Sequence, residues 1–567
     1  MLAETPAPKH HDEIFTQAAP NRELPWSALL GTVLVAAVVR LPDLSLPLEV
    51  RELDYVTVPW IGKSEFADPL RRALSFLADA IWYASLDEGA LRLPWLLTGL
   101  VAVLLTTYIV SAMAGTLAGI SAGLAVALAG NPTISGTALS PGPWVLTLSL
   151  MAVAIAVRGA FANVVCVLAI VCLLATVMTL GPAGWPAWLA VGALLVLRGR
   201  EIGTWRWRVS VGVYAVATAV FWLIQSGAQR FFWPPWNGST LRVLRGLWPE
   251  WVAPLAWALC VVGMWRTISR GAAWPIFVWF GTAVALNGLA QHRLWVLGED
   301  LLAVTYFSAL VLLAAGAAEL GEWMARVYGA RRLGIAAAVL LVVLPLLPLW
   351  PRQGMQTRRN WSEIARLVSD NVGLHDALAT SLCQRAVAFY APELFSRIPA
   401  ESDVGRALAV FPAADGGWLV TPVEAHLHPD WRRVQDWIDR FGVIDLSPEP
   451  GVHVFYYRRA GRQVALRRAA DFTLPVATLT RGRLLVDLLD VAGPVPTVLW
   501  KVDQLVLDQG ALVERNEALV DAAEKLMAHG QLDRADSLLQ RLLSFDPQWE
   551  RAAQAHERLR SRLPPGW

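Results

Sequence analysis

The chain contains few charged residues for its length. Charged side chains make up 17% of its 567 residues and hydrophobic ones 55%, with a mean hydropathy of +0.45. A soluble globular protein has about 25% charged residues. Most of the chain must therefore lie in lipid, and we expect a polytopic α-helical membrane protein. The net charge of +2 and the lack of a basic block argue against nucleic acid as a partner.

Cysteine is also scarce. Three of the four cysteines lie in apolar runs and only Cys383 falls in a soluble region, so no disulfide framework and no Cys-x-x-Cys metal site can form. The soluble region also lacks a Gly-x-Gly-x-x-Gly loop, a P-loop and a Gly-x-Ser-x-Gly turn. The sequence therefore implies no metal ion and no resident cofactor.

Long apolar runs fill the chain up to residue 351. A membrane-spanning helix needs roughly 20 apolar residues, and fewer where interfacial residues flank it. By that measure we predict about eleven spans. They lie near 26–42, 92–112, 115–130, 142–157, 161–179, 182–197, 208–226, 250–267, 273–291, 295–319 and 333–350. Residues 1–25 are predicted to be a polar tail and residues 26–351 the transmembrane core.

Arginines cluster on alternate connections between these runs, and this predicts the orientation. The clusters lie at residues 158, 198–208, 266–270 and 326–332. The positive-inside rule then places the N-terminus in the cytoplasm. With an odd number of spans, everything after residue 351 lies outside the membrane. The loop at 227–249 is external by this count although it contains arginines, and Arg245 among them is a candidate for function.

Beyond Pro351 the apolar runs give way to alternating helix and strand patterns. Helices are predicted at 361–372, 384–390 and 429–440, and strands at 377–381, 418–421 and 452–457. This alternation predicts a small external α/β domain over residues 352–480.

The C-terminal segment, residues 497–567, is predicted to be helical. Its small and apolar residues match the spacing of one tetratricopeptide repeat. They are Leu519, Ala522, Ala523, Leu526, Gly530, Ala535, Leu539, Leu542 and Pro547. A single repeat cannot bury its apolar face alone, so it must pack on flanking helices or on a partner protein. The stretch Gly493-Pro494-Val495-Pro496 predicts a linker in front of these helices.

The first external loop, residues 43–91, contains an acidic segment directly after the first span. Glu49, Glu52 and Asp54 lie within six residues of one another, together with Arg51. The second half of the loop begins with Asp68-Pro69 and continues with apolar residues at helical spacing. We expect an amphipathic helix there, in the membrane interface.

The order of parts around this loop is distinctive. The first span ends in Arg40-Leu41-Pro42, the acidic loop follows, and Glu88-Gly89-Ala90-Leu91-Arg92-Leu93-Pro94 enters the second span. This order resembles the GT-C membrane glycosyltransferases, in particular the branch of protein O-mannosyltransferases and aminoarabinose transferases. The resemblance covers residues 1–350, and the α/β region from Asn360 resembles the external domain that often follows such a core.

Members of that branch take a sugar from a polyprenyl-phosphate donor and pass it to an acceptor at the outer membrane face. The resemblance thus implies a multi-pass glycosyltransferase of a bacterial plasma (inner) membrane, with membrane lipids and the polyprenyl-phosphate donor as partners. The family's first loop carries Asp-Glu-x-x-Tyr, whose aspartate is taken as the catalytic carboxylate. The matching residues here are Arg51-Glu52-x-x-Tyr55, so an arginine occupies the aspartate position.

The chemistry of sugar transfer assigns roles to the carboxylates. A hydroxyl acceptor needs a general base. Glu52 is the first candidate because it occupies a retained motif position, and Asp54 or Glu49 are the alternatives.

The departing lipid phosphate needs a cation, and the planar guanidinium of arginine suits it better than lysine does. Arg293 matches a position where the family often has an arginine near the lipid phosphate, and Arg245, Arg51 and Tyr55 are further candidates for donor binding. Arg51 could also be an ordinary ion-pair partner of Glu52 or Asp54.

Two other functions remain open. The arginine at position 51 and the C-terminal repeat also fit a GT-C-derived protein that has lost catalysis and serves as a scaffold in envelope assembly. A lipid or sugar transporter is a third hypothesis, against which stand the large external domain and the lack of visible inverted repeats.

Overall fold

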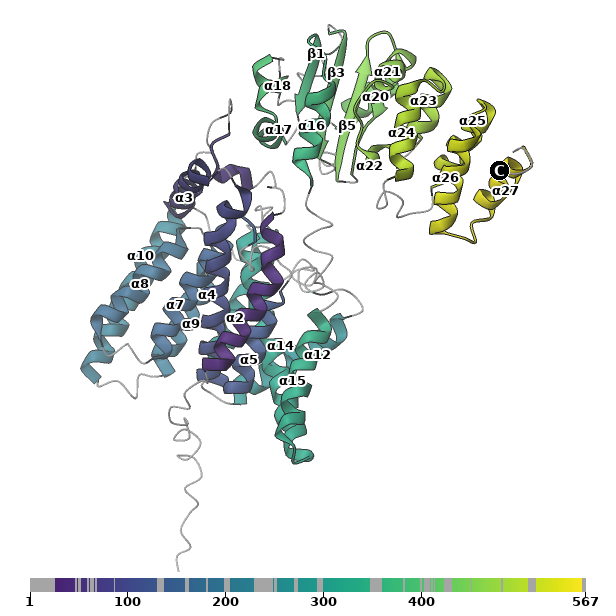
Figure 1. The fold of residues 1–567 in the computed structure, drawn as a ribbon. Helices are drawn as coiled ribbons and strands as arrows, with labels where there is room; N and C mark the ends of the chain where they lie inside the picture. Colours follow the sequence, from purple (N-terminus) through teal and green to yellow (C-terminus); the bar gives the residue numbers. More distant parts are fainter. Residues whose placement is uncertain are drawn as a thin grey trace, which may run out of the picture. The chain divides into compact units, whose positions relative to one another are not determined.

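The chain divides into two compact units. The computed structural model describes residues 26–45, 48, 52–58, 61, 66, 69–85, 87–129, 137–158, 163–179, 182–197, 204–228, 248, 252–269, 274–292, 299–346, 359–380, 383–397, 400–401, 408, 411, 414–422, 431–449, 451–480, 483–507 and 516–562. Unit 1 comprises Met1–Ser45, Phe66–Leu74 and Gly89–Gln356, and unit 2 comprises Leu46–Glu65, Ser75–Glu88 and Thr357–Trp567 (Figure 1). Part of the first predicted loop therefore belongs with the C-terminal half of the chain, a grouping that local sequence patterns did not suggest.

Unit 1 is a bundle of apolar helices, with a helix at each run predicted to be a span (Figure 1). In the described part of the chain they are α2 (Trp26–Arg40), α4 (Glu88–Ala114), α5 (Thr116–Ala127), α7 (Gly142–Val157), α8 (Val164–Met178), α9 (Trp185–Leu197), α10 (Thr204–Ala228), α12 (Ala253–Ser269), α13 (Trp274–His292), α14 (Glu299–Val327) and α15 (Arg331–Leu346). Among the described residues, Glu88–Ala114 and Ala303–Val327 are long and apolar enough to cross a membrane on their own. The number of crossings and their orientation stay predictions.

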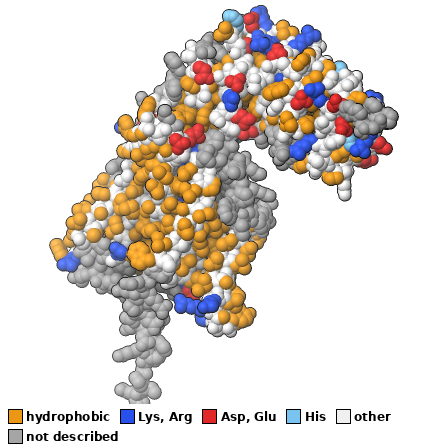
Figure 2. Space-filling model, in the orientation of Figure 1, with side chains coloured by type: hydrophobic (Ala, Val, Ile, Leu, Met, Phe, Trp, Pro, Cys, Tyr) orange, Lys and Arg blue, Asp and Glu red, His pale blue; other side chains and the backbone are white. Residues whose placement is uncertain are grey.

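The outer surface of unit 1 is apolar. On α2, Leu30, Leu34 and Val38 follow one another at a spacing of four residues and are 63–65% exposed. Residues four apart lie on one face of a helix, so these side chains form a continuous apolar stripe on the outside of the bundle. Figure 2 shows the same predominance of hydrophobic side chains over the visible surface of unit 1. Such a surface is stable against lipid and not against water, which indicates a bundle that lies in a membrane.

Small residues allow α12 and α14 to approach each other closely. A Cβ atom on Gly263 would lie 1.9 Å from the carbonyl oxygen of Leu312, and one on Gly316 would lie 1.9 Å from that of Leu259. The two glycines thus fit against each other's helix in a reciprocal way. In lipid, helices associate through such close packing because no hydrophobic driving force acts between them.

The substitution Gly316→Ala should destabilise unit 1. The new methyl group would meet a backbone carbonyl that cannot move away without separating the helices, and over-packing of this kind costs about 1–3 kcal/mol. The melting temperature of the purified protein in detergent measures the effect. Gly281→Ala on α13 is the matched control, because nothing lies within 4 Å of a Cβ atom at that position. Equal melting temperatures for the two variants would contradict the close α12–α14 contact.

One end of this helix pair is fixed by a buried arginine. The side chain of Arg266, on α12, is fully buried and pairs with Glu319 at 2.8 Å and Glu322 at 2.7 Å on α14. Its Nη2 atom also donates a hydrogen bond to the carbonyl oxygen of Ala114, the last residue of α4. A buried guanidinium needs such partners because an unpaired charge away from water is costly.

Unit 2 is built on a five-stranded mixed sheet in the order β2-β1-β3-β5-β4. Its strands are β1 (Asp376–Thr380), β2 (Ala400–Glu401), β3 (Gly416–Pro422), β4 (Ile444–Asp445) and β5 (Val452–Arg458). β1 runs parallel to β2 and β3, whereas β5 runs antiparallel to β3 and β4. The three longer strands were predicted from the sequence. The pairs of residues in β2 and β4 were missed, because two residues are too few to show an alternating pattern.

Helices cover both faces of the sheet, as the burial of every residue in β1 and β3 requires. They are α16 (Trp361–Asn371), α17 (Gln384–Tyr390), α18 (Pro392–Arg397), α20 (Trp431–Phe441), α21 (Arg462–Ala469) and α22 (Val476–Thr480). On one face, Leu419 and Tyr457 pack with Trp437 of α20. On the other face, Trp418 stacks on Phe472 at a ring distance of 5.4 Å. The helices predicted at 361–372, 384–390 and 429–440 are confirmed, and the external location of this unit stays a prediction.

The chain ends in an array of helices that continues unit 2 (Figure 1). They are α23 (Leu484–Ala492), α24 (Pro496–Leu507), α25 (Glu517–Ala528), α26 (Leu532–Phe545) and α27 (Glu550–Arg560). The predicted repeat, α25 with α26, packs on the flanking helices α23, α24 and α27. Whether it belongs to the tetratricopeptide class stays a prediction. The predicted linker is a short turn, since α24 begins at Pro496 itself.

Lys501 ties α24 to the sheet-covering helices. It is 2% exposed, and its Nζ donates to the carbonyl oxygens of Ala470 at 2.6 Å and Thr497 at 3.3 Å. Ala470 caps the C-terminus of α21, where the helix dipole favours a cation. Burial nevertheless lowers the pKa of Lys501 from 10.5 to about 8, with Asp471 opposing the shift. The folded protein therefore binds this proton more weakly than the unfolded chain does.

The stability of wild type relative to Lys501→Met should increase with pH. At neutral pH the buried charge of Lys501 lowers the free energy of unfolding. Between pH 8 and 10.5 the folded state releases this proton while the unfolded state keeps it, so the free energy of unfolding rises with pH through this window. Melting temperatures of both proteins at pH 7.5 and 9.5 measure the difference. Lys525→Met, which removes a lysine side chain that is 42% exposed, controls for the loss of one charge. A pH-independent difference between wild type and Lys501→Met would rule out this linkage.

Candidate functional site

The acidic segment forms a single turn of 3-10 helix, η2 (Glu52–Tyr55). Glu52 and Tyr55 are buried, with 3% and 5% of their surface exposed, whereas the side chain of Asp54 is 42% exposed. The turn therefore presents one of its carboxylates to the outside and encloses the other.

The remaining predicted site residues are not placed by the structure. Glu49, Arg51, Arg245 and Arg293 lie outside the described residues. Their roles stay predictions. Of the predicted site residues, the structure brings together Glu52, Asp54 and Tyr55, which are neighbours in the chain.

Helix α3 (Pro69–Ser85) holds the turn from one side, through residues that belong to unit 2. The buried hydroxyl of Ser75 donates to the carbonyl oxygen of Tyr55 at 3.0 Å. One helical turn later, the carboxylate of Asp79 accepts from the backbone N–H of Thr57 at 2.7 Å and from its hydroxyl at 3.1 Å. Hydrogen bonds to a charged acceptor are the stronger ones. Asp79 therefore fixes the backbone directly after the turn.

Helix α17 holds the same segment from the α/β part of unit 2. Arg385 lies 3.5 Å from Asp54, measured from Nε to Oδ1. The hydroxyl of Tyr390 accepts from the backbone N–H of Leu48 at 2.8 Å and donates to the carboxylate of Glu88 at 2.9 Å. These contacts join both ends of the acidic loop segment to one short helix.

The position of α17 follows from its own packing. Ala386 and Val387 are fully buried within unit 2, which leaves Arg385 and Phe389, one turn apart, on the side that meets the loop. The ring of Phe389 lies 4.8 Å from that of Trp82 on α3. At the start of α17, burial raises the pKa of the Cys383 thiol, so the thiol stays protonated and donates to the carbonyl oxygen of Val420 on β3.

Sequence reasoning missed Ser75, Asp79, Arg385 and Tyr390. Ser75 and Asp79 share one face of a helix that was predicted, so their spacing of four residues was an available signal. No local pattern could reveal Tyr390, which is 342 residues from Leu48.

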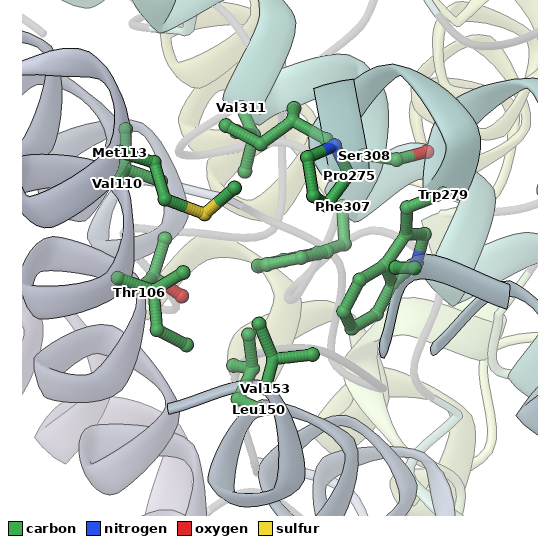
Figure 3. Close-up of a pocket in the computed structure, with 13 residues that line it drawn as sticks. Thr106, Val110, Met113, Leu150, Val153, Pro275, Trp279, Phe307, Ser308 and Val311 are labelled. Carbon is green, nitrogen blue, oxygen red and sulfur yellow. The ribbon is translucent and has the colours of Figure 1, made fainter. Parts of the chain in front are cut away.

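An apolar cavity lies within unit 1, and the carboxylates of the acidic turn do not line it. Its volume is about 30 Å³. Its lining residues come from α4, α7, α9, α13 and α14. Those labelled in Figure 3 are Thr106, Val110 and Met113 of α4, Leu150 and Val153 of α7, Pro275 and Trp279 of α13, and Phe307, Ser308 and Val311 of α14. The hydroxyls of Thr106 and Ser308 bond to carbonyls of their own helices. The residues that line this small cavity include no charged side chain that could bind a phosphate or act as a base in sugar transfer.

Comparisons with known proteins yield only distant similarities. No protein-family profile and no curated protein matches the chain. The crystal structure of ArnT from Cupriavidus metallidurans in the apo state is 14% identical, with a TM-score of 0.43 over 76% of this chain and 98% of that one. ArnT from the same organism bound to undecaprenyl phosphate is 15% identical, with a TM-score of 0.39 over 76% and 97%. The Archaeoglobus fulgidus oligosaccharyltransferase in the apo form is 10% identical, with a TM-score of 0.44 over 73% and 71%. With all three TM-scores below 0.5, these similarities assign neither a fold family nor an activity to this chain.

The substitution Tyr390→Phe should loosen the acidic segment. It removes the acceptor of the Leu48 N–H and a donor to Glu88 while keeping the ring in place. Loss of the hydrogen bond from Leu48, the one that lies in the acidic segment, costs about 0.5–1.5 kcal/mol, so amide exchange in this segment should become roughly 2- to 10-fold faster. Hydrogen–deuterium exchange of the peptide covering residues 46–58, in the full-length protein, measures this. Tyr83→Phe is the control, because Tyr83 on α3 is 68% exposed. Identical exchange in both variants would show that the Tyr390 hydroxyl does not hold the loop.

Proposed function

We propose that this chain is a membrane glycosyltransferase, which moves a sugar from a polyprenyl-phosphate donor to an envelope acceptor at the outer face of the membrane. The observation that carries the proposal is the acidic turn Glu52–Tyr55, which retains two positions of the GT-C motif and is held by two helices. A catalytic carboxylate has to be kept in place to be effective, since the positioning of reacting groups accounts for much of a catalysed rate.

The two carboxylates of the turn differ in exposure. Glu52 occupies the motif position and is buried, whereas Asp54 is more exposed and faces the guanidinium of Arg385. A general base has to come within hydrogen-bond distance of the acceptor hydroxyl. We keep Glu52 as the first candidate for this base. Asp54, with its greater exposure, is the alternative.

The donor phosphate would be bound by arginines. Arg51, Arg245 and Arg293 remain the proposed phosphate ligands, and Tyr55, the last residue of the turn, is a further candidate for donor binding. Arg385 is a further guanidinium near the turn that the sequence did not indicate. Stabilisation of a developing phosphate charge by fixed cations is a large contribution to this kind of transfer.

The apolar helices of unit 1 support a location in a membrane. We propose a cytoplasmic N-terminus and an external unit 2, because the arginines cluster on alternate connections. In this arrangement the acidic turn and α17 would both face the side on which the lipid-linked donor is used.

A catalytically inactive scaffold is the second candidate function. Arginine at position 51, where the family has its aspartate, and the helical array α23–α27 favour it. Helical arrays of this kind present extended surfaces to other proteins. In that case the acidic turn would be a structural remnant and α25–α27 would contact a partner.

Replacing the proposed base distinguishes the two candidates. Glu52→Gln keeps size and hydrogen bonding but cannot accept a proton, so transfer should fall by about 10²- to 10⁴-fold. The measurement is the release of polyprenyl phosphate from radiolabelled lipid-linked sugars, extracted from the source cells and incubated with purified protein. Asp87→Asn, an exposed carboxylate in the same loop, is the matched control. Binding of undecaprenyl phosphate is followed in parallel by native mass spectrometry.

Two results would contradict the proposed transferase activity. A triple variant, Glu49→Gln with Glu52→Gln and Asp54→Asn, that keeps the wild-type rate would remove the acidic turn from catalysis. A wild-type protein that binds undecaprenyl phosphate but releases none from lipid-linked sugars would favour the scaffold.

A further inference from the structure

A second site of strongly charged side chains lies in unit 2, where β5 ends and α21 begins. A hollow of about 480 Å³ is lined there by Asp415, Arg458, Arg459, Ala460, Val464 and Arg468. We call it the arginine hollow. Its lining thus holds three guanidinium groups against one carboxylate, and none of these residues belongs to the proposed glycosyltransferase site.

One of the three guanidinium groups is oriented by buried partners. Arg458 donates from Nε to the hydroxyl of Tyr456 at 2.6 Å, and its Nη1 lies 3.4 Å from Oδ1 of Asp376. Tyr456 is fully buried, and the Asp376 side chain is 1% exposed. Burial, together with the charge of Asp376, raises the pKa of Tyr456 to about 12, so the phenol is neutral at physiological pH. Arg458 is therefore fixed before any ligand arrives, which reduces the entropy lost on binding.

Gly416, the first residue of β3, leaves space for the pair of Asp376 and Arg458. A Cβ atom at Gly416 would lie 2.8 Å from Oδ1 of Asp376 and 3.0 Å from Cδ of Arg458. Glycine at this position leaves room for the carboxylate and the guanidinium side by side. A larger residue would push one of the two away.

The other two arginines are exposed at the rim. Arg459 follows β5 directly, and its backbone N–H donates to the carbonyl oxygen of Asp415 at 3.1 Å, which closes the turn against the start of β3. Arg468 lies on α21 one turn after Val464, so both line the hollow from the same side of the helix. Guanidinium groups from the end of β5 and from α21 thus line one space.

From this geometry we infer that the arginine hollow binds an anion that carries a phosphate group, such as a phosphate monoester or a diphosphate. Guanidinium groups match phosphate oxygens in paired hydrogen bonds, and several of them are needed for a doubly charged group. The hollow is open to solvent and has room for more than a bare ion. The phosphate can belong to a soluble molecule or to a lipid headgroup, and the two sources are distinguished below.

Binding of pyrophosphate to the full-length protein in detergent tests the inference. Isothermal titration in 150 mM NaCl, where about 8 Å of screening length suppresses unspecific surface attraction, gives the affinity. The variant Arg459→Gln/Arg468→Gln should weaken binding by at least about tenfold, because it removes two guanidinium groups that would make charge-assisted hydrogen bonds to the phosphate. Both side chains are exposed, so this variant should fold like the wild type.

A matched control removes the same charge elsewhere. Arg432→Gln/Arg467→Gln changes two exposed arginines of unit 2 that do not line the hollow, and it should leave the affinity unchanged. A second titration uses a short-chain, water-soluble phosphatidic acid. Tighter binding of this lipid than of pyrophosphate, lost in Arg459→Gln/Arg468→Gln, would identify a lipid headgroup, and the reverse order would identify a soluble ligand.

Two results would overturn the inference. Either neither probe binds the wild type, or both bind the Arg459→Gln/Arg468→Gln variant as tightly as the wild type. Neither result bears on sugar transfer, which is measured with the carboxylates of the first loop.

Discussion

The hydroxyl group of Tyr390 joins three segments that are far apart in the chain. It accepts a hydrogen bond from the backbone of Leu48, donates one to Glu88, and belongs to a helix that is packed into the α/β part of unit 2. A single phenol can do this because its oxygen is donor and acceptor at once. The consequence is that the acidic turn is tied to the C-terminal half of the chain, and that its shape depends on how the sheet and α17 are folded.

A second constraint acts on the apolar helices. In lipid, each backbone polar group has to be satisfied within its own helix, and helices associate through close packing rather than through the hydrophobic effect. The reciprocal fit of Gly263 and Gly316 shows this in unit 1. The buried Arg266 adds a polar contact at one end of the same pair, where Glu319 and Glu322 remain 29% and 33% exposed. Packing in the middle and ion pairs at the end together hold α12 against α14.

Charge is distributed differently in unit 2. In its C-terminal array, ion pairs between partly exposed residues link alternate helices: Arg534 pairs with Asp503 between α26 and α24, and Arg558 with Glu524 between α27 and α25. Each such pair contributes little to stability, typically below about 1 kcal/mol. The arginine hollow differs from these pairs, because buried Asp376 and Tyr456 orient Arg458 while the lining retains an excess of guanidinium groups. An excess of guanidinium groups around a concave surface favours the binding of anions.

The sequence by itself determined the helices and strands whose hydrophobic residues follow a clear pattern. Apolar runs predicted each of the apolar helices that the structure describes in unit 1, because a chain in lipid has few ways to satisfy its backbone. The alternating pattern after residue 351 predicted β1, β3 and β5, and the motif around Glu52 and Tyr55 directed attention to the first loop. These features are local, and local spacing is what a sequence displays directly.

Only the tertiary structure decided which distant residues meet. Arg385 and Tyr390 contact the acidic turn because α17 buries Ala386 and Val387 and leaves its other side to the loop. The arginine hollow exists because the antiparallel pairing of β3 with β5 brings Gly416 opposite Arg458. Such contacts depend on the packing of the whole unit. The side chains that make them are hundreds of residues apart in the chain or lie on different strands. For that physical reason no stretch of sequence contains them by itself.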